Sequence, residues 1–118
     1  METLSEKAFE GRALPELAAL VEAFDGFTDE LFAELAGDVL TIEFSDDARY
    51  VINSHIAARQ IWLAAERSAW HFDAHPDGRW LDRRTGGELW ATVRELLTKK
   101  LGRPVVFESS LVQRRTPS

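Results

Sequence analysis

Apolar and polar residues alternate along two stretches in the middle of the chain. The apolar positions that recur at every second residue are Leu40, Ile42, Phe44, Ile61 and Leu63. Successive side chains of a β-strand point to opposite faces, so this spacing predicts strands over 39–45 and 59–65, each with one buried face. Further short strands are predicted over 49–53, 70–73 and 79–82.

The register of the second of these strands places an indole in an unusual position. If Ile61 and Leu63 face the core, Trp62 and Gln60 face away from it. An indole on a solvated sheet face is costly unless another segment covers it or a partner binds it. Periodicity leaves two alternatives open: a helix or loop covers Trp62 as ordinary core, or Trp62 belongs to a binding surface.

A helix is predicted before the strands. Apolar residues recur at intervals of three and four from Ala13 to Phe24, and Asp25-Gly26 ends the pattern. Pro15 has no backbone donor, and its ring crowds the carbonyl of the residue four positions earlier. This helix is therefore expected either to begin near Pro15 or to bend there.

A second helix is predicted after the strands. Its apolar stripe runs from Leu89 to Leu101, Thr85-Gly-Gly-Glu88 has the spacing of a capping box, and Gly102 ends it. Val105–Phe107 is expected to cover the helix ends.

The order helix, short strands, helix predicts an α+β fold. Two helices would pack as one layer on one face of an antiparallel sheet, and the other face would stay open. A chain of 118 residues suits a single domain, 1–118, with a flexible tail over 109–118.

Charge is unevenly distributed along the chain. Residues 1–47 carry a net charge of −11 and residues 48–118 one of +5, which together give the net charge of −6. An acidic half of this kind is suited to cations or to a basic partner, and it argues against a nucleic-acid backbone as its partner. The alternative is a merely solubilising acidic face.

Several functions lack the residues they need. The chain has no cysteine, which excludes disulfides, thiolate-held iron–sulfur clusters and Cys zinc sites. Its first residues resemble neither a signal nor a transit peptide, and no apolar run approaches the roughly 20 residues that cross a bilayer. No nucleophile–base, Walker or dinucleotide motif occurs. We therefore expect a cytoplasmic protein without membrane attachment, and not an enzyme.

A set of residues in the second and third quarters of the chain resembles the frataxin family, closest to its bacterial members. These residues are Asn53, Gln60-Ile61-Trp62-Leu63, Trp70-His71-Phe72-Asp73, Trp80, Asp82 and Gly86. The resemblance covers roughly residues 39–97. It implies the same two-layer α+β fold, with five or six strands, and a role in iron–sulfur cluster assembly.

The resemblance also decides an ambiguous segment. Thr28 to Leu35 has the local pattern of a short helix with Thr28 as its N-cap. Frataxins have their first strand here, followed by a hairpin turn that Ala36-Gly37-Asp38 matches. We predict the strand, because tertiary pairing often overrides weak local preference.

The acidic candidate site lies where the first helix ends. Its residues are Glu22, Asp25, Asp29 and Glu30, with Glu34 as a further candidate. Carboxylate oxygens suit hard cations and high-spin iron, and exposed acids without thiolate or imidazole bind them weakly. By resemblance, this is the acidic ridge through which frataxins bind iron (Fe²⁺ or Fe³⁺) and contact cysteine desulfurase. Positions at which bacterial relatives usually have acids are occupied by Ala18, Ala19, Ala23 and Phe27, so the ridge is thinned.

The second candidate site is the open sheet face with Asn53, Gln60 and Trp62. By resemblance, these positions contact the scaffold protein and the desulfurase of the assembly complex. Amides beside an aromatic residue are typical of a protein interface. Of the three histidines, none has metal-ligand spacing, and His71 beside Asp73 is the one alternative metal ligand.

The sequence thus predicts a monomeric regulator or iron donor that binds desulfurase and scaffold and has no chemistry of its own. Three alternatives stay open: a protein-binding module that has lost iron binding, a ferroxidase, and an iron-buffering protein without a protein partner.

Overall fold

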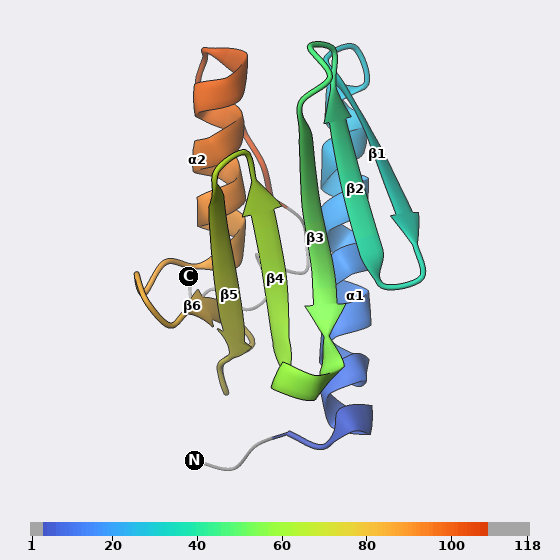
Figure 1. Ribbon diagram of the computed structural model, residues 1–118, viewed down its shortest axis with the longest axis vertical. Coiled ribbons are helices and arrows are strands. Elements are labelled where there is room, and N and C mark those ends of the chain that lie inside the picture. Colours follow the sequence, from blue (N-terminus) through green and yellow to red (C-terminus); the bar gives the residue numbers. More distant parts are fainter. Residues whose placement is uncertain (1–3, 109–118) are drawn as a thin grey trace.

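The computed structural model describes residues 4–108 (Figure 1). The flexible tail predicted over 109–118 lies outside the described residues. The helices, 3₁₀ turns and strands are, in order, α1 (Glu6–Phe24), η1 (Asp25–Phe27), β1 (Leu31–Ala36), β2 (Val39–Phe44), β3 (Arg49–His55), η2 (Ile56–Ala58), β4 (Gln60–Ala65), β5 (Ser68–Ala74), β6 (Trp80–Asp82) and α2 (Leu89–Leu101).

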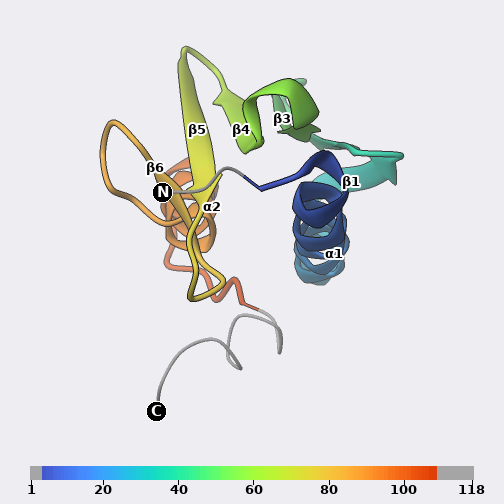
Figure 2. The same ribbon diagram turned by 90° about the horizontal axis from the view of Figure 1, so that it is seen from below.

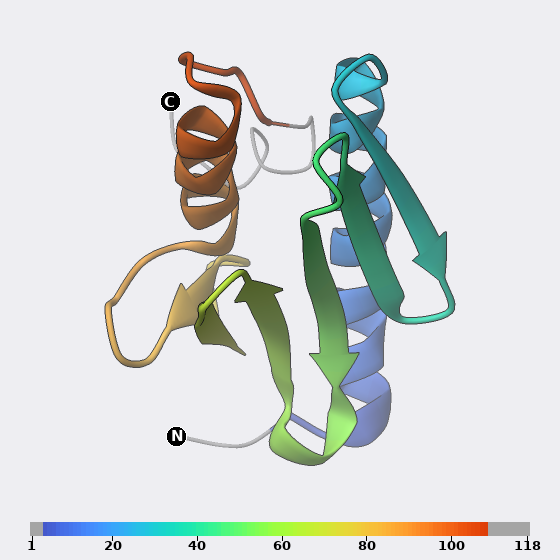
Figure 3. The same cartoon turned by 45° about the horizontal axis from the view of Figure 1, so that its top comes forward.

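The strands form one six-stranded sheet in the order β1-β2-β3-β4-β5-β6, and every neighbouring pair is antiparallel. Both helices lie on the same side of this sheet, as the views in Figure 2 and Figure 3 show. The predicted two-layer α+β fold is therefore confirmed, and in the described part of the chain the second sheet face carries no helix (Figure 2).

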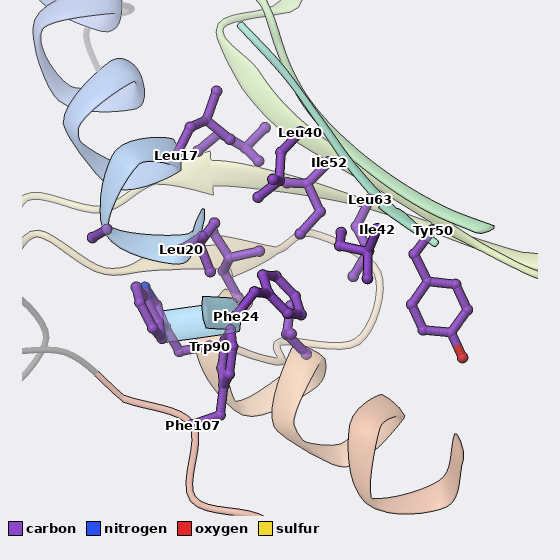
Figure 4. Packing of buried hydrophobic residues seen from close by; sticks show 14 of the residues in the cluster. Leu17, Leu20, Phe24, Leu40, Ile42, Tyr50, Ile52, Leu63, Trp90 and Phe107 are labelled. Carbon is purple, nitrogen blue, oxygen red and sulfur yellow. The ribbon is translucent and has the colours of Figure 1, made fainter. Parts of the chain in front are cut away.

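The predicted core register is also confirmed. The five alternating apolar residues are 6% exposed or less: Leu40, Ile42, Phe44, Ile61 and Leu63. Figure 4 shows Leu40 and Ile42 pointing toward the apolar stripe of α1, which includes Leu17, Leu20 and Phe24. Side chains one position away along each strand consequently face the open side.

An aromatic cluster closes one end of the core. The ring of Phe107 lies 4.7 Å from that of Phe24 and 5.1 Å from that of Trp90, centroid to centroid. Phe107 comes from the segment after α2 and is 3% exposed (Figure 4). The prediction that this segment covers the helix ends is confirmed at Phe107.

Helix α1 begins earlier than predicted. Its N-cap is Ser5, whose Oγ accepts a hydrogen bond from the Ala8 backbone N–H (3.1 Å), and the helix continues through Pro15. The prediction of a start near Pro15 is wrong. Pro15 and Gly11, whose carbonyl the proline ring crowds, are both on the exposed side, while Phe9 and Leu17 are buried on the core side. Packing on both sides of Pro15 therefore outweighs the lost hydrogen bond.

The segment after α1 forms a strand, as predicted against its local helical pattern. Thr28 lies in the turn that follows η1, and β1 pairs with β2 along its whole length. Gly37 makes the hairpin turn with a φ of 62°, a backbone conformation that glycine adopts without strain.

Helix α2 starts three residues later than a capping box at Thr85 requires. Glu88 is its N-cap, and the Glu88 carboxylate accepts hydrogen bonds from the backbone N–H groups of Trp90 and Ala91. Thr85 instead donates through Oγ1 to Asp82 (2.9 Å). The predicted end at Gly102 is confirmed, with a left-handed φ of 72°.

Within residues 4–108, no helix has the length and apolar character needed to cross a membrane.

Candidate functional site

The open face of the sheet carries a stack of three rings. Trp62 on β4 lies between His55 on β3, at 3.9 Å between ring centroids, and His71 on β5, at 4.3 Å. The rings are nearly parallel, with interplanar angles of 12° and 15°. Cross-strand pairing produces this arrangement, because His71 is directly opposite Trp62 and His55 is one diagonal away on the other side.

This stack decides between the two alternatives for Trp62. No helix or loop of the described chain, residues 4–108, covers it, and the side chain is half-buried, since its two ring faces are occupied by imidazoles. A partner therefore has access to the edges of the three rings and not to a face of the indole. The His55 ring is held in place by its Nδ1, which accepts a hydrogen bond from the Ala58 backbone N–H (3.3 Å).

A chain of hydrogen bonds runs beside the stack. Trp62 Nε1 donates to Gln60 Oε1 (2.9 Å), and Gln60 Nε2 donates to Asp73 Oδ1 (3.0 Å). Arg83 then donates to both oxygens of Asp73, from Nε and Nη2, at 3.0 Å each. These bonds raise the pKa of the Arg83 guanidinium. We call the residues of the stack and this chain the open-face cluster: His55, Gln60, Trp62, His71, Asp73 and Arg83.

Asp82 supports the open-face cluster from its buried edge. The side chain is 4% exposed and accepts hydrogen bonds from the backbone N–H of His71 (2.9 Å) and of Thr85 (2.8 Å). Burial alone would raise the pKa of this carboxyl, but the hydrogen bonds from Thr85 and His71 outweigh burial and lower it below 3.8. Asp82 is therefore ionised at neutral pH and fixes the backbone that carries the His71 ring.

The other two predicted residues of this face differ in exposure. Gln60 is only 8% exposed, because Trp62 and Asp73 engage both ends of its amide. Asn53 is directly opposite Trp62 in the β3–β4 register and is half-buried, with its Nδ2 donating to the Ser54 carbonyl (3.2 Å). Gln60 thus holds the indole in place rather than presenting its own amide to a partner.

The predicted acidic residues lie at the opposite edge of the sheet. We call them the acidic surface: Glu22, Asp25, Asp29, Glu30 and Glu34. They lie in the last turn of α1, in η1, in the turn after it and in β1, and all are exposed except the partly buried Glu30. Glu30 forms an ion pair with Arg103, whereas the others make no ion pair with any described residue.

The acidic surface does not form a closed metal site. In the part of the chain that the structure describes, no group of three or more His, Asp or Glu side chains could hold a metal ion. Two of the four positions at which acids were noted as missing, Ala19 and Phe27, are core positions with exposures of 9% and 8%. Only Ala18 and Ala23 are therefore places where an acid would add to the surface.

The positions of two further side chains were not predicted. Phe32 on β1 is 64% exposed and lies on the same sheet face as Glu34. His75 is away from both candidate sites, in the turn after β5, where its Nδ1 lies 3.0 Å from Asp77.

Comparison with known protein families identifies the family to which the chain belongs. A family model described as a frataxin-like domain matches residues 2–103. The chain belongs to the frataxin family. The resemblance carried by Asn53, Trp62 and the residues around them is thereby confirmed.

Curated relatives of this frataxin-family chain cover most of its length. A protein of Paraburkholderia xenovorans named iron–sulfur cluster assembly protein CyaY is 35% identical over 106 residues, which are 90% of this chain and 100% of the relative. A protein of Ralstonia pickettii with the same name is 33% identical over 104 residues, covering 85% of this chain and 91% of the relative.

Solved structures show the same fold. A frataxin from Psychromonas ingrahamii superposes with a TM-score of 0.81 at 24% identity and covers 90% of this chain and 100% of that one. A trimeric frataxin from the yeast Saccharomyces cerevisiae, complexed with ferrous iron, has a TM-score of 0.69 at 26% identity. The match covers 87% of this chain and 92% of the yeast chain.

In this frataxin-family chain the predicted site residues fall into two separate places. Gln60 and Trp62 contact each other, Asn53 flanks them, and the acidic residues lie at the far edge. Sequence analysis missed the role of His55 and Arg83. The strand registers alone would have placed His55 and His71 beside Trp62. The register between two strands cannot be deduced from the apolar spacing within either strand.

Proposed function

We propose that this chain takes part in iron–sulfur cluster assembly as a regulator or iron donor, and that it binds a cysteine desulfurase and a scaffold protein. The name of its curated relatives supports the pathway. The observation that carries the proposal of a protein partner is the three-ring stack around Trp62, which is preorganised on a sheet face that neither α1 nor α2 covers (Figure 2).

The open-face cluster has the physical properties of a binding hot spot. Aromatic residues held rigid before binding lose little conformational entropy when a partner docks. Gln60 and the two imidazoles hold Trp62 in a single orientation, and Asn53 offers an adaptable amide beside it. We propose that the scaffold and the desulfurase contact the edge of this stack.

The acidic surface would bind iron and attract the desulfurase through charge rather than through fixed contacts. Its carboxylates lack fixed geometry, so they would hold Fe²⁺ or Fe³⁺, the protein's cargo, weakly and without selectivity. The same charges would attract a basic partner over distance and speed its association. A ferrous complex of a yeast frataxin is consistent with iron binding in the family.

A second candidate is a protein-binding module that has lost iron binding. The ion pair between Glu30 and Arg103 favours it, because it removes one carboxylate from the acidic surface. Ferroxidase activity is not favoured, because oxidising iron with oxygen requires a site that fixes the metal, and the acidic side chains are not gathered into one.

Co-purification tests the proposal. The tagged full-length chain should retain a cysteine desulfurase–scaffold complex at low salt, and Trp62→Ala should retain much less. Arg94→Ala, which removes a large exposed side chain from α2, on the other side of the sheet from the stack, is the control and should retain the complex as the parent does. Absence of the complex with the parent chain would refute the proposed partners. Titration with Fe²⁺ then separates the two candidates, since only the first predicts salt-sensitive binding.

A further inference from the structure

A pocket of about 590 Å³ lies beside the open-face cluster, between the start of β5 and the loop from β6 to α2. Its polar lining includes Gln60, Arg67, Ser68, His71, Arg83 and Arg84. Three guanidinium groups thus line one pocket, at the edge of the sheet opposite the acidic surface. The size is in the range of small-molecule sites, which are typically roughly 300–1,000 Å³.

Two of these arginines have N–H groups that could donate hydrogen bonds to a ligand. Arg67, at the turn between β4 and β5, forms no ion pair with any described residue. Arg84 uses Nη2 to donate to the Ala69 carbonyl (3.3 Å), which holds its side chain along the free edge of β5. A guanidinium has five N–H donors, so most of the donors of Arg84 face the pocket or solvent.

The third arginine shows what this geometry accepts. Arg83 binds the Asp73 carboxylate through two parallel hydrogen bonds of 3.0 Å. Such a fork is the geometry in which guanidinium groups recognise carboxylate and phosphate. The Asp73 carboxylate is therefore an oxyanion already bound by one of the arginines that line the pocket.

The acid in the lining does not cancel the positive charge. Asp82 is 4% exposed, and its two oxygens accept hydrogen bonds from the His71 backbone and from Thr85. Asp73 balances Arg83. Counting these pairs leaves Arg67 and Arg84 in excess of the single buried carboxylate, with Ser68 and His71 as neutral polar neighbours.

We propose that this pocket binds a small oxyanion that carries at least two negative charges on carboxylate or phosphate groups. One charged group would lie between Arg67 and Arg84, and a second would reach Ser68 and the polar edge of His71. The inference goes beyond the proposed function and needs neither iron nor a protein partner. Because the arginines are exposed, we expect affinity in the millimolar range, roughly, and a decline with added salt.

Nuclear magnetic resonance of the full-length, ¹⁵N-labelled chain tests the proposal. Citrate and inorganic phosphate are titrated separately at pH 7.5, with NaCl adjusted to hold ionic strength constant, and NaCl alone is the reference. We expect saturable shifts of the Ser68, Ala69 and Arg84 amides and of the Trp62 indole N–H. Tighter binding of citrate would assign the site to polycarboxylates, and tighter binding of phosphate to phosphate compounds.

A pair of double variants locates the site. Arg67→Ala/Arg84→Ala should weaken binding by about tenfold or more, because the variant loses the charged hydrogen bonds that both guanidinium groups would donate to the anion. Arg94→Ala/Lys99→Ala removes two exposed charges from α2 that form no ion pair within residues 4–108, and should change binding less than twofold. Melting curves confirm that both variants fold.

Three results would overturn the inference. The first is shifts that do not saturate or that NaCl alone reproduces. The second is equal loss of binding in both double variants, which would indicate a diffuse attraction to net charge. The third is unchanged binding in a folded Arg67→Ala/Arg84→Ala variant, which would place the anion elsewhere.

Discussion

The acidic surface and the open-face cluster lie at opposite edges of one sheet, and they differ in how their side chains are held. In the acidic surface, only Glu30 has an ion-pair partner among residues 4–108. In the open-face cluster, every side chain contacts another, from the His55–Trp62–His71 stack to the bidentate Arg83–Asp73 pair. Loosely held charges act over distance and are screened by salt, whereas preorganised rings act at contact.

This difference predicts that the two regions control different steps of binding. Charges of the acidic surface should set how fast a partner arrives. The open-face cluster should set how long it stays, because central aromatic residues carry most of the energy of an interface.

Removal of the indole should have the strongest effect. Trp62→Ala is expected to weaken binding to a desulfurase–scaffold complex by about 30-fold, equivalent to about 2 kcal/mol. Trp62→Phe keeps a ring between the imidazoles and loses only the hydrogen bond to Gln60, so it should bind more tightly than Trp62→Ala. Calorimetry gives both affinities. Equal affinities for Trp62→Ala and the parent would remove the stack from the interface.

The support beneath the cluster predicts a pH-dependent stability. The folded state holds the pKa of Asp82 below 3.8, so the ionised carboxylate adds stability above that pH, and this contribution is lost as the pH falls below 3.8. Asp82→Asn should lower the free energy of unfolding at pH 7 by about 2 kcal/mol, because it weakens hydrogen bonds to a charged, buried acceptor.

Urea unfolding at pH 7 and at pH 3 measures this effect. The difference between the parent and Asp82→Asn should shrink at the lower pH. Asp29→Asn, on the acidic surface and without an ion-pair partner among the described residues, should match the parent at pH 7. An Asp82→Asn variant as stable as Asp29→Asn would show that the buried carboxylate does not support the cluster.

Iron binding should respond more modestly, because exposed carboxylates contribute little individually. Glu22→Ala/Asp25→Ala is expected to weaken Fe²⁺ binding by about fivefold, and added salt should weaken it in the parent. Glu10→Ala/Glu95→Ala removes two charges outside the acidic surface and is the control. Tight, salt-insensitive binding that the first double variant retains would place the ligands elsewhere, with His71 and Asp73 as the first residues to test.

The sequence was sufficient for the fold wherever local pattern and tertiary pairing agree. The alternation through Ile42 and Ile61 located the sheet and its buried face, because apolar residues at every second position indicate a β-strand with one buried face. Pattern failed where packing outweighs a local signal. Helix α1 passes through Pro15 because Phe9 and Leu17 are buried on either side of it. Thr85 loses the N-cap position to Glu88 because Asp82 engages its hydroxyl.

The candidate site was predicted in part for a related reason. Trp62 could be placed on the open face from its own strand, but its neighbours His55 and His71 come from two other strands. Their contact depends on the registers of β3–β4 and β4–β5, which form only in the folded sheet. The exposed acids were easier to find because charge is visible residue by residue, yet their ion pairing with distant residues such as Arg103 is not.

The most direct test of the contrast between the two surfaces is the kinetics of binding to a cysteine desulfurase–scaffold complex, measured at about 50 mM and about 300 mM NaCl. Glu22→Ala/Asp25→Ala should slow association at low salt and flatten its salt dependence, with the dissociation rate unchanged. Trp62→Ala should raise the dissociation rate and keep the salt dependence of association. If both variants changed the same rate constant, or if Trp62→Ala left dissociation unchanged while melting like the parent, the two surfaces would not have the separate roles assigned to them.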